Sequence, residues 1–203
     1  MMLKNFWNLL RNKGKEVEVI SGKRCYLKPF VPEDAKDVAQ LVLENRDFWS
    51  LYEPRHVESY YSVFTQYHKL AESARLRERN LEHFYGIYEY SSEKLIGQIS
   101  LYNIKPLPFS SCFIGYAMDQ HYTGKGIASE AIELIVNFAF YTLQVNRIEA
   151  YVSPRNMASI RVLEKAGFKQ EGLLKELLYI NGKWEDHYIY ALTANRFFKS
   201  GER

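Results

Sequence analysis

A short glycine loop in the second half of the chain has the spacing needed to bind an anion. Gly124 and Gly126 follow a predicted strand and precede a predicted helix. Glycine permits the tight turn, and the free N–H groups of the first helical turn then point at one position. Lys125 adds a positive charge, worth about 1 kcal/mol because solvent screens it. The loop predicts a diphosphate site formed by Gly124, Lys125, Gly126, Ile127, Ala128 and Ser129.

Other interpretations of this loop fit the sequence less well. An isolated Gly-x-Gly before a helix is most often an ordinary turn. A Walker loop requires Gly-Lys followed by Ser or Thr, whereas Gly126 follows Lys125. A dinucleotide fingerprint requires a third glycine, where Ser129 stands, and a parallel βαβ start. Glu149 lies roughly 20 residues on, as a ribose-binding acid would, so an NAD enzyme stays a weak alternative.

A second pair of polar residues lies downstream of the loop. Asn156 falls in the first turn or at the cap of a predicted helix, and Ser159 follows one turn later on the same side. Two hydrogen-bonding side chains that face one direction could flank a thioester. Taken alone, such residues more often satisfy the amide groups of their own helix.

The composition favours a single globular domain and excludes several classes of protein. The chain has 203 residues, a net charge of +3, and interleaved acidic and basic residues, which gives little support to DNA binding. Cys25 and Cys112 lie far apart, and the five histidines lack metal-ligand spacing, so no metal site is predicted. No apolar run reaches the roughly 18 residues that span a bilayer. We expect a cytoplasmic protein.

The N-terminal segment differs in character from the rest of the chain. Residues 1–20 are predicted to be an amphipathic extension, in which Leu3, Phe6, Trp7 and Leu10 share one face of a short helix. A membrane-surface anchor is a weaker alternative. The main domain is expected over residues 21–195, with a tail at 196–203.

The domain itself alternates between strand and helix patterns. A strand at 24–30 precedes a helix opened by Pro32, and residues 57–82 form one long helix or two short ones. Three strands in succession, FYGIYEY, LIGQISLYN and SCFIGYAM, are joined by turns and predict antiparallel pairing. After the glycine loop come a helix, the strand RIEAYV, a helix closed by Gly167, and a hairpin that turns at Asn181-Gly182. The pattern indicates a mixed α/β chain of the α+β class with a mostly antiparallel sheet.

The loop and the downstream helix together carry a specific resemblance. QHYTGKGIASEA followed by V-x-P-x-N-x-x-S-x-x-x-L-E-K-x-G-F resembles the GNAT superfamily of acetyl-CoA-dependent N-acetyltransferases. The resemblance implies a sheet whose fourth and fifth strands splay apart to admit the pantetheine arm; these would be Cys112 to Met118 and Arg147 to Val152. It implies acetyl-CoA as co-substrate and adds four cofactor-binding residues to the loop: Tyr116, Ala117, Met118 and Asn156.

Within the superfamily, the chain resembles the ribosomal-protein-alanine acetyltransferase branch, particularly its RimJ members. This resemblance extends from Arg24 to Thr193. It includes Glu44-Asn45-Arg46, Glu53-Pro54, Ile114-Gly115-Tyr116, Asn181-Gly182-Lys183-Trp184 and Asp186-His187. The resemblance implies that the acceptor is the N-terminal amine of a ribosomal protein. The first helices should cover the acceptor cleft, where Trp49, Tyr52 and Tyr60 lie.

The resemblance also assigns catalytic roles, with one gap. The branch uses a serine near the thiol, so Ser159 is the expected acid for the departing thiolate. A tyrosine acid found in many members corresponds to Leu163, and a carboxylate of some members corresponds to Leu178. Glu176, two residues earlier and expected on the same strand face, could replace that carboxylate. Glu149 or Glu176 is therefore the predicted proton acceptor, and a backbone N–H near Met118 should polarise the carbonyl.

Acid–base chemistry favours an α-amine as acceptor. At pH 7 an α-amine with a pKa of about 7.8 is neutral in roughly one molecule in seven, and a lysine in only about one in 2,500. An enzyme without an evident strong base therefore suits an N-terminus. Two alternatives stay open: transfer to an aminoglycoside, polyamine or amino acid, and a non-catalytic acetyl-CoA-binding ribosome-assembly factor. The N-terminal segment could contact the ribosome or a second subunit.

Overall fold

The computed structural model describes residues 7–12 and 15–201, and these form a mixed sheet flanked by helices. The strands are β1 (Trp7–Asn12), β2 (Lys15–Ser21), β3 (Cys25–Pro29), β4 (His83–Glu89), β5 (Leu95–Lys105), β6 (Ser111–Met118), β7 (Arg147–Val152), β8 (Lys169–Ile180) and β9 (Lys183–Thr193). The helices are α1 (Ala35–Glu44), α2 (Arg46–Trp49), α3 (Val63–Glu78), α4 (Ile127–Asn137), α5 (Met157–Lys165) and α6 (Ala194–Gly201). Short 3₁₀ turns cover Pro32–Asp34, Glu58–Tyr61 and Gln120–Tyr122, and a π-helical turn covers Phe138–Thr142.

The strands lie in the order β1-β2-β3-β4-β5-β6-β7-β9-β8. All neighbours pair antiparallel except β6 and β7, which are parallel and joined by the crossover helix α4. The predicted meander of three antiparallel strands and the single β-α-β crossover are both confirmed. A parallel pair needs a long crossover because both strands run in the same direction.

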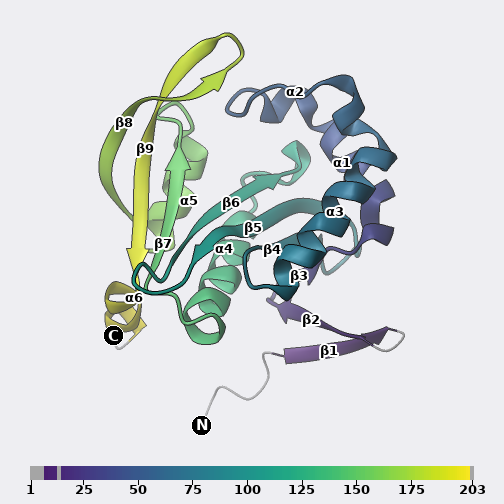
Figure 1. Cartoon of the computed structure of the whole chain (residues 1–203), viewed down its shortest axis with the longest axis horizontal. Coiled ribbons are helices and arrows are strands. Elements are labelled where there is room, and N and C mark those ends of the chain that lie inside the picture. The colour runs from purple at the N-terminus through teal and green to yellow at the C-terminus, as the bar shows by residue number, and fades with distance from the viewer. Residues whose placement is uncertain (1–6, 13–14, 202–203) are drawn as a thin grey trace.

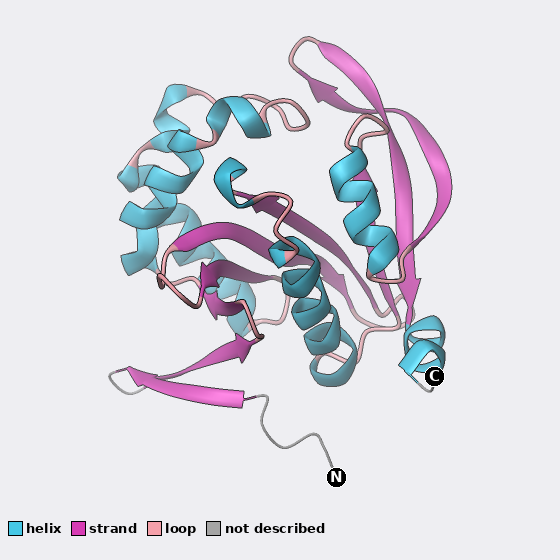
Figure 2. Cartoon of the chain, turned by 180° about the vertical axis from the view of Figure 1, so that it is seen from behind, coloured by secondary structure: helices cyan, strands magenta, loops and turns pink. Residues whose placement is uncertain are grey.

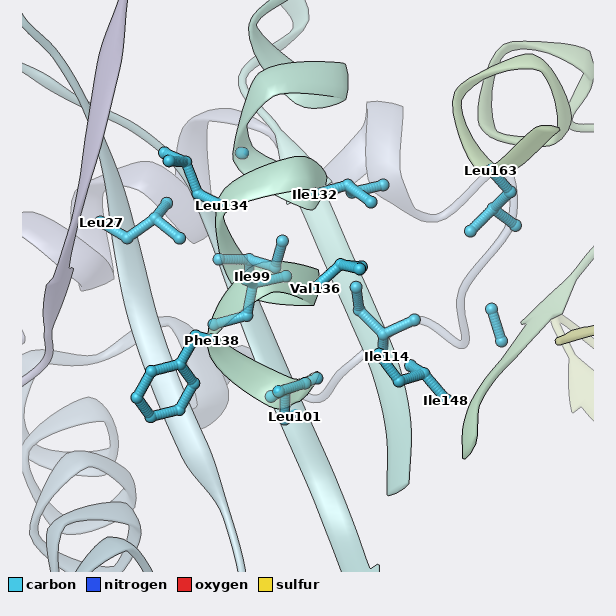
Figure 3. Close-up of a cluster of buried hydrophobic side chains, with 14 of the residues drawn as sticks. Leu27, Ile99, Leu101, Ile114, Ile132, Leu134, Val136, Phe138, Ile148 and Leu163 are labelled. Atoms are coloured by element: carbon cyan, nitrogen blue, oxygen red, sulfur yellow. The ribbon is translucent and has the colours of Figure 1, made fainter. Parts of the chain in front are cut away.

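Helices cover both faces of the sheet. Helices α1 and α3 lie on one face, and α4 and α5 lie on the face seen in Figure 2. The apolar face of α4 is buried in the main core, where Ile132 and Ile135 are fully enclosed, and Phe138 in the following π-helical turn packs beside strand residues such as Ile99 (Figure 3). A smaller core under α1 and α3 contains Val38 and Leu70. These two cores fix the helix ends that border the site.

The N-terminal segment is a β-hairpin, so the predicted helix is wrong for residues 7–12. Strand β1 pairs with β2 from Trp7↔Ile20 to Asn12↔Lys15, and β2 continues the sheet through Ile20↔Leu27. A helix of fewer than about 12 residues is marginal in water, whereas strand pairing satisfies backbone groups at the open edge of β3. The predicted residues Leu3 and Phe6 lie outside the described residues.

Strand β2 and helix α6 both pack against the rest of the described fold (Figure 1). Strand β2 crosses the boundary predicted at residue 20, and Ile20 is buried. Helix α6 begins just before the predicted tail, and Phe197 stacks on Phe140 with ring centroids 4.7 Å apart. In the part of the chain that the structure describes, no helix combines the length and apolar character that crossing a membrane requires.

Strands β6 and β7 separate after a short stretch of pairing. They pair at Ser111↔Arg147, Cys112↔Ile148 and Phe113↔Glu149 and then diverge toward α2 and the β8–β9 turn (Figure 1). Backbone groups in the second half of β6 are thereby released from a β7 partner. The predicted splayed pair is confirmed, and it leaves one end of β6 free to contact a ligand.

Candidate active site

The glycine loop has the backbone conformation that anion binding requires. Gly124 and Gly126 adopt left-handed φ angles of 75° and 78°, which favour glycine. Gly126 is the N-cap of α4, so the amides of the first turn have no partner within the helix. Ile127 is buried in the core, and Ala128 and Ser129 follow it in the same turn. A Cβ atom on Gly126 would lie only 2.6 Å from Arg24 Nη1.

Two cations border this loop, and the sequence indicated only one of them. Lys125 Nζ lies 4.5 Å from the centre of the Tyr122 ring. Arg24 Nη1 donates a hydrogen bond of 3.1 Å to the Lys125 carbonyl. The turn before β3 is held there because Glu130 Oε1 accepts hydrogen bonds from the Lys23 and Arg24 amides. No local signal in the sequence links Arg24 to a loop 101 residues away.

The structure brings the predicted residues Tyr116, Ser159 and Asn156 together. Tyr116 on β6 and Ser159 on α5 share a hydrogen bond of 2.7 Å between their hydroxyl oxygens. The Tyr116 hydroxyl also lies 3.2 Å from the Ser159 carbonyl. Asn156 Oδ1 accepts a hydrogen bond of 3.0 Å from the Ser159 amide, so Asn156 caps α5. This contact joins β6 to α5 beside the point where β6 and β7 diverge.

The Tyr116 phenol has one proton and two possible acceptors on Ser159. Burial raises the pKa of the phenol to about 12, although its hydrogen bond to Ser159 opposes the shift, so the phenol is protonated at neutral pH. Its proton can go to the Ser159 carbonyl oxygen at 3.2 Å or to Ser159 Oγ at 2.7 Å. When the proton goes to Oγ, the serine hydroxyl can donate its own proton to another acceptor.

The two carboxylates predicted as proton acceptors have different surroundings. Glu149 accepts a hydrogen bond of 2.6 Å from Arg147 Nε, and Arg147 also binds Glu171. Glu176 is exposed and has a left-handed φ of 50°. A bulge between Leu174 and Leu178 interrupts the pairing of β8 with β9. The expected side-chain alternation that put Glu176 on the same face as Leu178 is therefore wrong, because extra residues in a bulge break the two-residue period.

The segment around α2 is anchored to the splayed end of β6. Trp49 Nε1 donates a hydrogen bond of 2.8 Å to the Met118 carbonyl. Buried Asn45 accepts one of 2.9 Å from the Gln120 amide. The side chain of Trp49 thus lies beside Ala117 and Met118, the last residues of the predicted cofactor strand. The sequence placed Trp49 over an acceptor cleft but gave no sign of this contact.

The same segment is tied on its other side to the β8–β9 hairpin. Asn181 Nδ2 donates a hydrogen bond of 2.7 Å to the Ser50 carbonyl, and Asn181 Oδ1 accepts one of 3.2 Å from the Arg55 amide. Arg155 Nη2 lies 3.3 Å from the Leu51 carbonyl. The segment from 45 to 55 therefore bridges β6 and the hairpin above the diverging strands (Figure 1).

Aromatic rings and buried thiols complete the surroundings. The Phe113 ring lies between those of Tyr102 and Tyr151, with centroids 5.7 and 4.9 Å away. Burial raises the pKa of both Cys25 and Cys112 to about 12, so neither thiol supplies a nucleophile at neutral pH.

Within residues 7–12 and 15–201 no cluster of metal-ligating side chains occurs.

Known proteins share this architecture. The acetyltransferase (GNAT) domain family matches residues 24–169. The probable N-acetyltransferase YjcK of Bacillus subtilis is 41% identical over 86% of this chain and 96% of its own length. The [ribosomal protein uS5]-alanine N-acetyltransferase of Escherichia coli is 30% identical over 79% of this chain and 83% of its own. Mycobacterium smegmatis RimJ in complex with CoA-disulfide has a TM-score of 0.79 and 27% identity, covering 87% of this chain and 89% of that one.

Proposed function

Because this chain belongs to the GNAT family of acetyl-CoA-dependent N-acetyltransferases, we propose that its acceptor is the N-terminal amine, an alanine amine, of a ribosomal protein. The observation that carries this proposal is the similarity to the uS5-alanine acetyltransferase, which covers 79% of the chain. The region of similarity is long enough to include the α2 segment and Ser159 as well as the glycine loop. We expect the reaction in the cytoplasm, where ribosomes are.

Acetyl-CoA is the co-substrate, and the residues of the loop fit its diphosphate. A Cβ atom on Gly124 would meet no atom within 4 Å, so the loop backbone is accessible there, and the first-turn amides of α4 are free to bind an anion. We assign the diphosphate to Gly124–Ser129, with Lys125 at the mouth. The edge of β6 from Tyr116 to Met118, together with Asn156, would hold the pantetheine arm.

The end of β6 supplies the expected donor for the developing oxyanion. The N–H and C=O groups of one strand residue point to the same edge of the strand. Since the Met118 carbonyl meets Trp49 and the neighbouring Asp119 amide bonds back to β5 through the Ile96 carbonyl, the Met118 amide faces away from β5. A preorganised N–H at such a position stabilises charge that develops on a carbonyl oxygen.

Proton transfer is assigned to the residues on α5. Ser159 would donate its proton to the thiolate that leaves, and the protonated Tyr116 phenol would hold the serine oxygen in place. Transfer proceeds by direct attack of the amine, so no nucleophilic side chain is required. Glu149 and Glu176 stay predicted acceptors of the amine proton, and Glu149 is already paired with Arg147.

Intact-mass analysis of ribosomal proteins tests this function in the native host. Ribosomes from cells with and without the gene should differ by one acetyl group on a single N-terminus. Cells that carry only the Ser159→Ala form serve as the control and should resemble the deletion. Identical masses for every ribosomal protein, together with rapid transfer to a small amine by the purified enzyme, would contradict the proposal.

A further inference from the structure

We propose that the Glu53 carboxylate binds the ammonium group of the acceptor and takes its first proton. This rests on the proposed transfer to an amine, and it adds a base that lies outside the β7 and β8 strands. Glu53 lines a small pocket under α2 together with Trp49, Arg46, His56 and Tyr60. The pocket thus contains a carboxylate on the acceptor side of the diverging strands.

Backbone contacts place Glu53 next to the expected transfer point. Its amide donates a hydrogen bond of 3.0 Å to the Trp49 carbonyl, so Glu53 follows Trp49 by one turn. The Trp49 indole in turn binds the Met118 carbonyl at the free end of β6. Neighbouring residues one turn apart share a side of the chain. Glu53 therefore lies close in the chain to Trp49, whose indole donates to the Met118 carbonyl of the cofactor strand.

The charge of Glu53 also acts on Tyr102, one of the aromatic rings beside Phe113. The pKa of Tyr102 on β5 is raised first by burial, then by Tyr151 and by Glu53. Tyr102 stacks on Phe113, where β6 and β7 part, so the charge of Glu53 acts on the side of the molecule where the strands diverge.

The Glu53 carboxylate is not neutralised by its neighbours. Glu53 is exposed, and among the described residues its carboxylate has no hydrogen bond or ion pair. Partial desolvation raises its pKa, and the charge of Lys69 opposes that shift. Lys69 Nζ is engaged elsewhere, since it donates to the Tyr60 hydroxyl at 3.1 Å. A carboxylate without a partner is accessible to an incoming cation and is stabilised by it.

The other charged groups around the pocket leave this role to Glu53. Arg46 lies 3.8 Å from Glu58 in an ion pair. The pKa of His56 is lowered by burial and by Lys69, so the ring is neutral near pH 7 and adds no competing positive charge. Tyr60 and Tyr61 line the same pocket.

The proton balance of the step is complete without another reactant. Glu53 takes one proton from the acceptor's ammonium and later releases it to water. The freed lone pair forms the C–N bond, the C–S bond breaks, and the second nitrogen proton ends on the thiol through Ser159. One ammonium and one acetyl-CoA give one amide, one CoA thiol and one proton.

The test compares Glu53→Gln with Glu72→Gln, a matched control that removes the same charge from the exposed Glu72 on α3. The acceptor is whichever of alanine-, serine- and methionine-starting peptides and spermidine the wild-type enzyme acetylates fastest. At pH 7 we expect kcat/KM to fall about 10²-fold in Glu53→Gln and to stay within twofold in Glu72→Gln. Calorimetry should give the same CoA affinity for both.

The pH profile separates a proton acceptor from a merely structural residue. With a peptide acceptor, kcat/KM of Glu53→Gln should rise with pH until the pH reaches the pKa of the free α-amine, about 7.8. The reason is that only the neutral amine can react in the absence of the base. The control should reach its maximum at lower pH. Superimposable profiles and rates for the two variants overturn the role of Glu53. A preference for spermidine over every peptide contradicts the ribosomal acceptor instead, and the comparison of variants then decides on Glu53 with spermidine.

Discussion

The cofactor half and the acceptor half of the site are built in different ways. The cofactor half uses consecutive backbone groups, from Gly124 to the first turn of α4. The acceptor half uses side chains that meet across long stretches of sequence: Trp49 contacts a residue 69 positions away, and Asn181 one 131 positions away. A backbone-built site depends on glycine geometry, whereas a side-chain-built site depends on tertiary packing. Mutations should therefore affect the two halves separately.

The largest effect is expected in the cofactor half, from Gly126→Val. Valine strongly disfavours a φ of 78°, and its Cβ would also displace the flexible Arg24 guanidinium, which lies 2.6 Å from that position. CoA affinity measured by calorimetry should fall by about 10²-fold or more, since the loop amides would move away from the diphosphate. The control is Gly182→Val in the β8–β9 turn, where φ is 92° and no atom lies within 4 Å. Unchanged CoA affinity in a folded Gly126→Val protein would show that the site lies elsewhere.

The next effect tests the point where the two halves meet. Ser159→Ala should lower kcat by about 10²-fold while CoA affinity changes only a few-fold, because a proton donor acts mainly in the transition state. Tyr116→Phe removes the same hydrogen bond but keeps the serine hydroxyl, so its kcat should fall less. Steady-state kinetics and thermal melts of both variants distinguish a catalytic role of Ser159 from a purely structural one. A less stable Ser159→Ala protein with wild-type kcat would remove Ser159 from the mechanism.

The contrast between the halves also explains what the sequence could predict. Strand alternation, the glycine loop and the Asn156 cap are local features, so they were predictable from neighbouring residues. The contact between Tyr116 and Ser159 joins residues 43 positions apart and required the fold.

The errors have the same origin. The bulge near Glu176 adds residues that no two-residue pattern reveals. Trp7 and Leu10 have helical spacing, yet they belong to a strand because β2 offers a partner. In each case a tertiary or cross-strand partner outweighs the local pattern.

A smaller effect is expected in the acceptor half from Asn181→Gly. Glycine keeps the left-handed turn at φ 49° but removes the hydrogen bonds to Ser50 and Arg55. Each such bond contributes about 1 kcal/mol net, so the KM for an alanine-starting peptide should rise about 10-fold. Asn80→Gly is the control, because Asn80 is another left-handed asparagine, after α3. If CoA affinity falls as much as the peptide KM rises, the two halves are not separable.

The smallest effect concerns Arg24, a side chain in the cofactor half that reaches the glycine loop from a distant part of the sequence. Arg24 is exposed and donates to the Lys125 carbonyl from a turn 101 residues away, so it can support the loop and attract the diphosphate. An exposed cation contributes less than about 1 kcal/mol, so Arg24→Gln should weaken CoA binding about threefold at low salt. Because salt screens exposed charges, the difference should disappear in about 1 M salt, where the screening length is roughly 3 Å. Arg75→Gln, an exposed change on α3 that removes only the Glu72 ion pair, should leave CoA affinity unaltered at both salt concentrations. A loss of 10²-fold in Arg24→Gln that persists at high salt would mean that the cofactor half also depends on a long-range side chain, and the contrast with the acceptor half would then be one of degree.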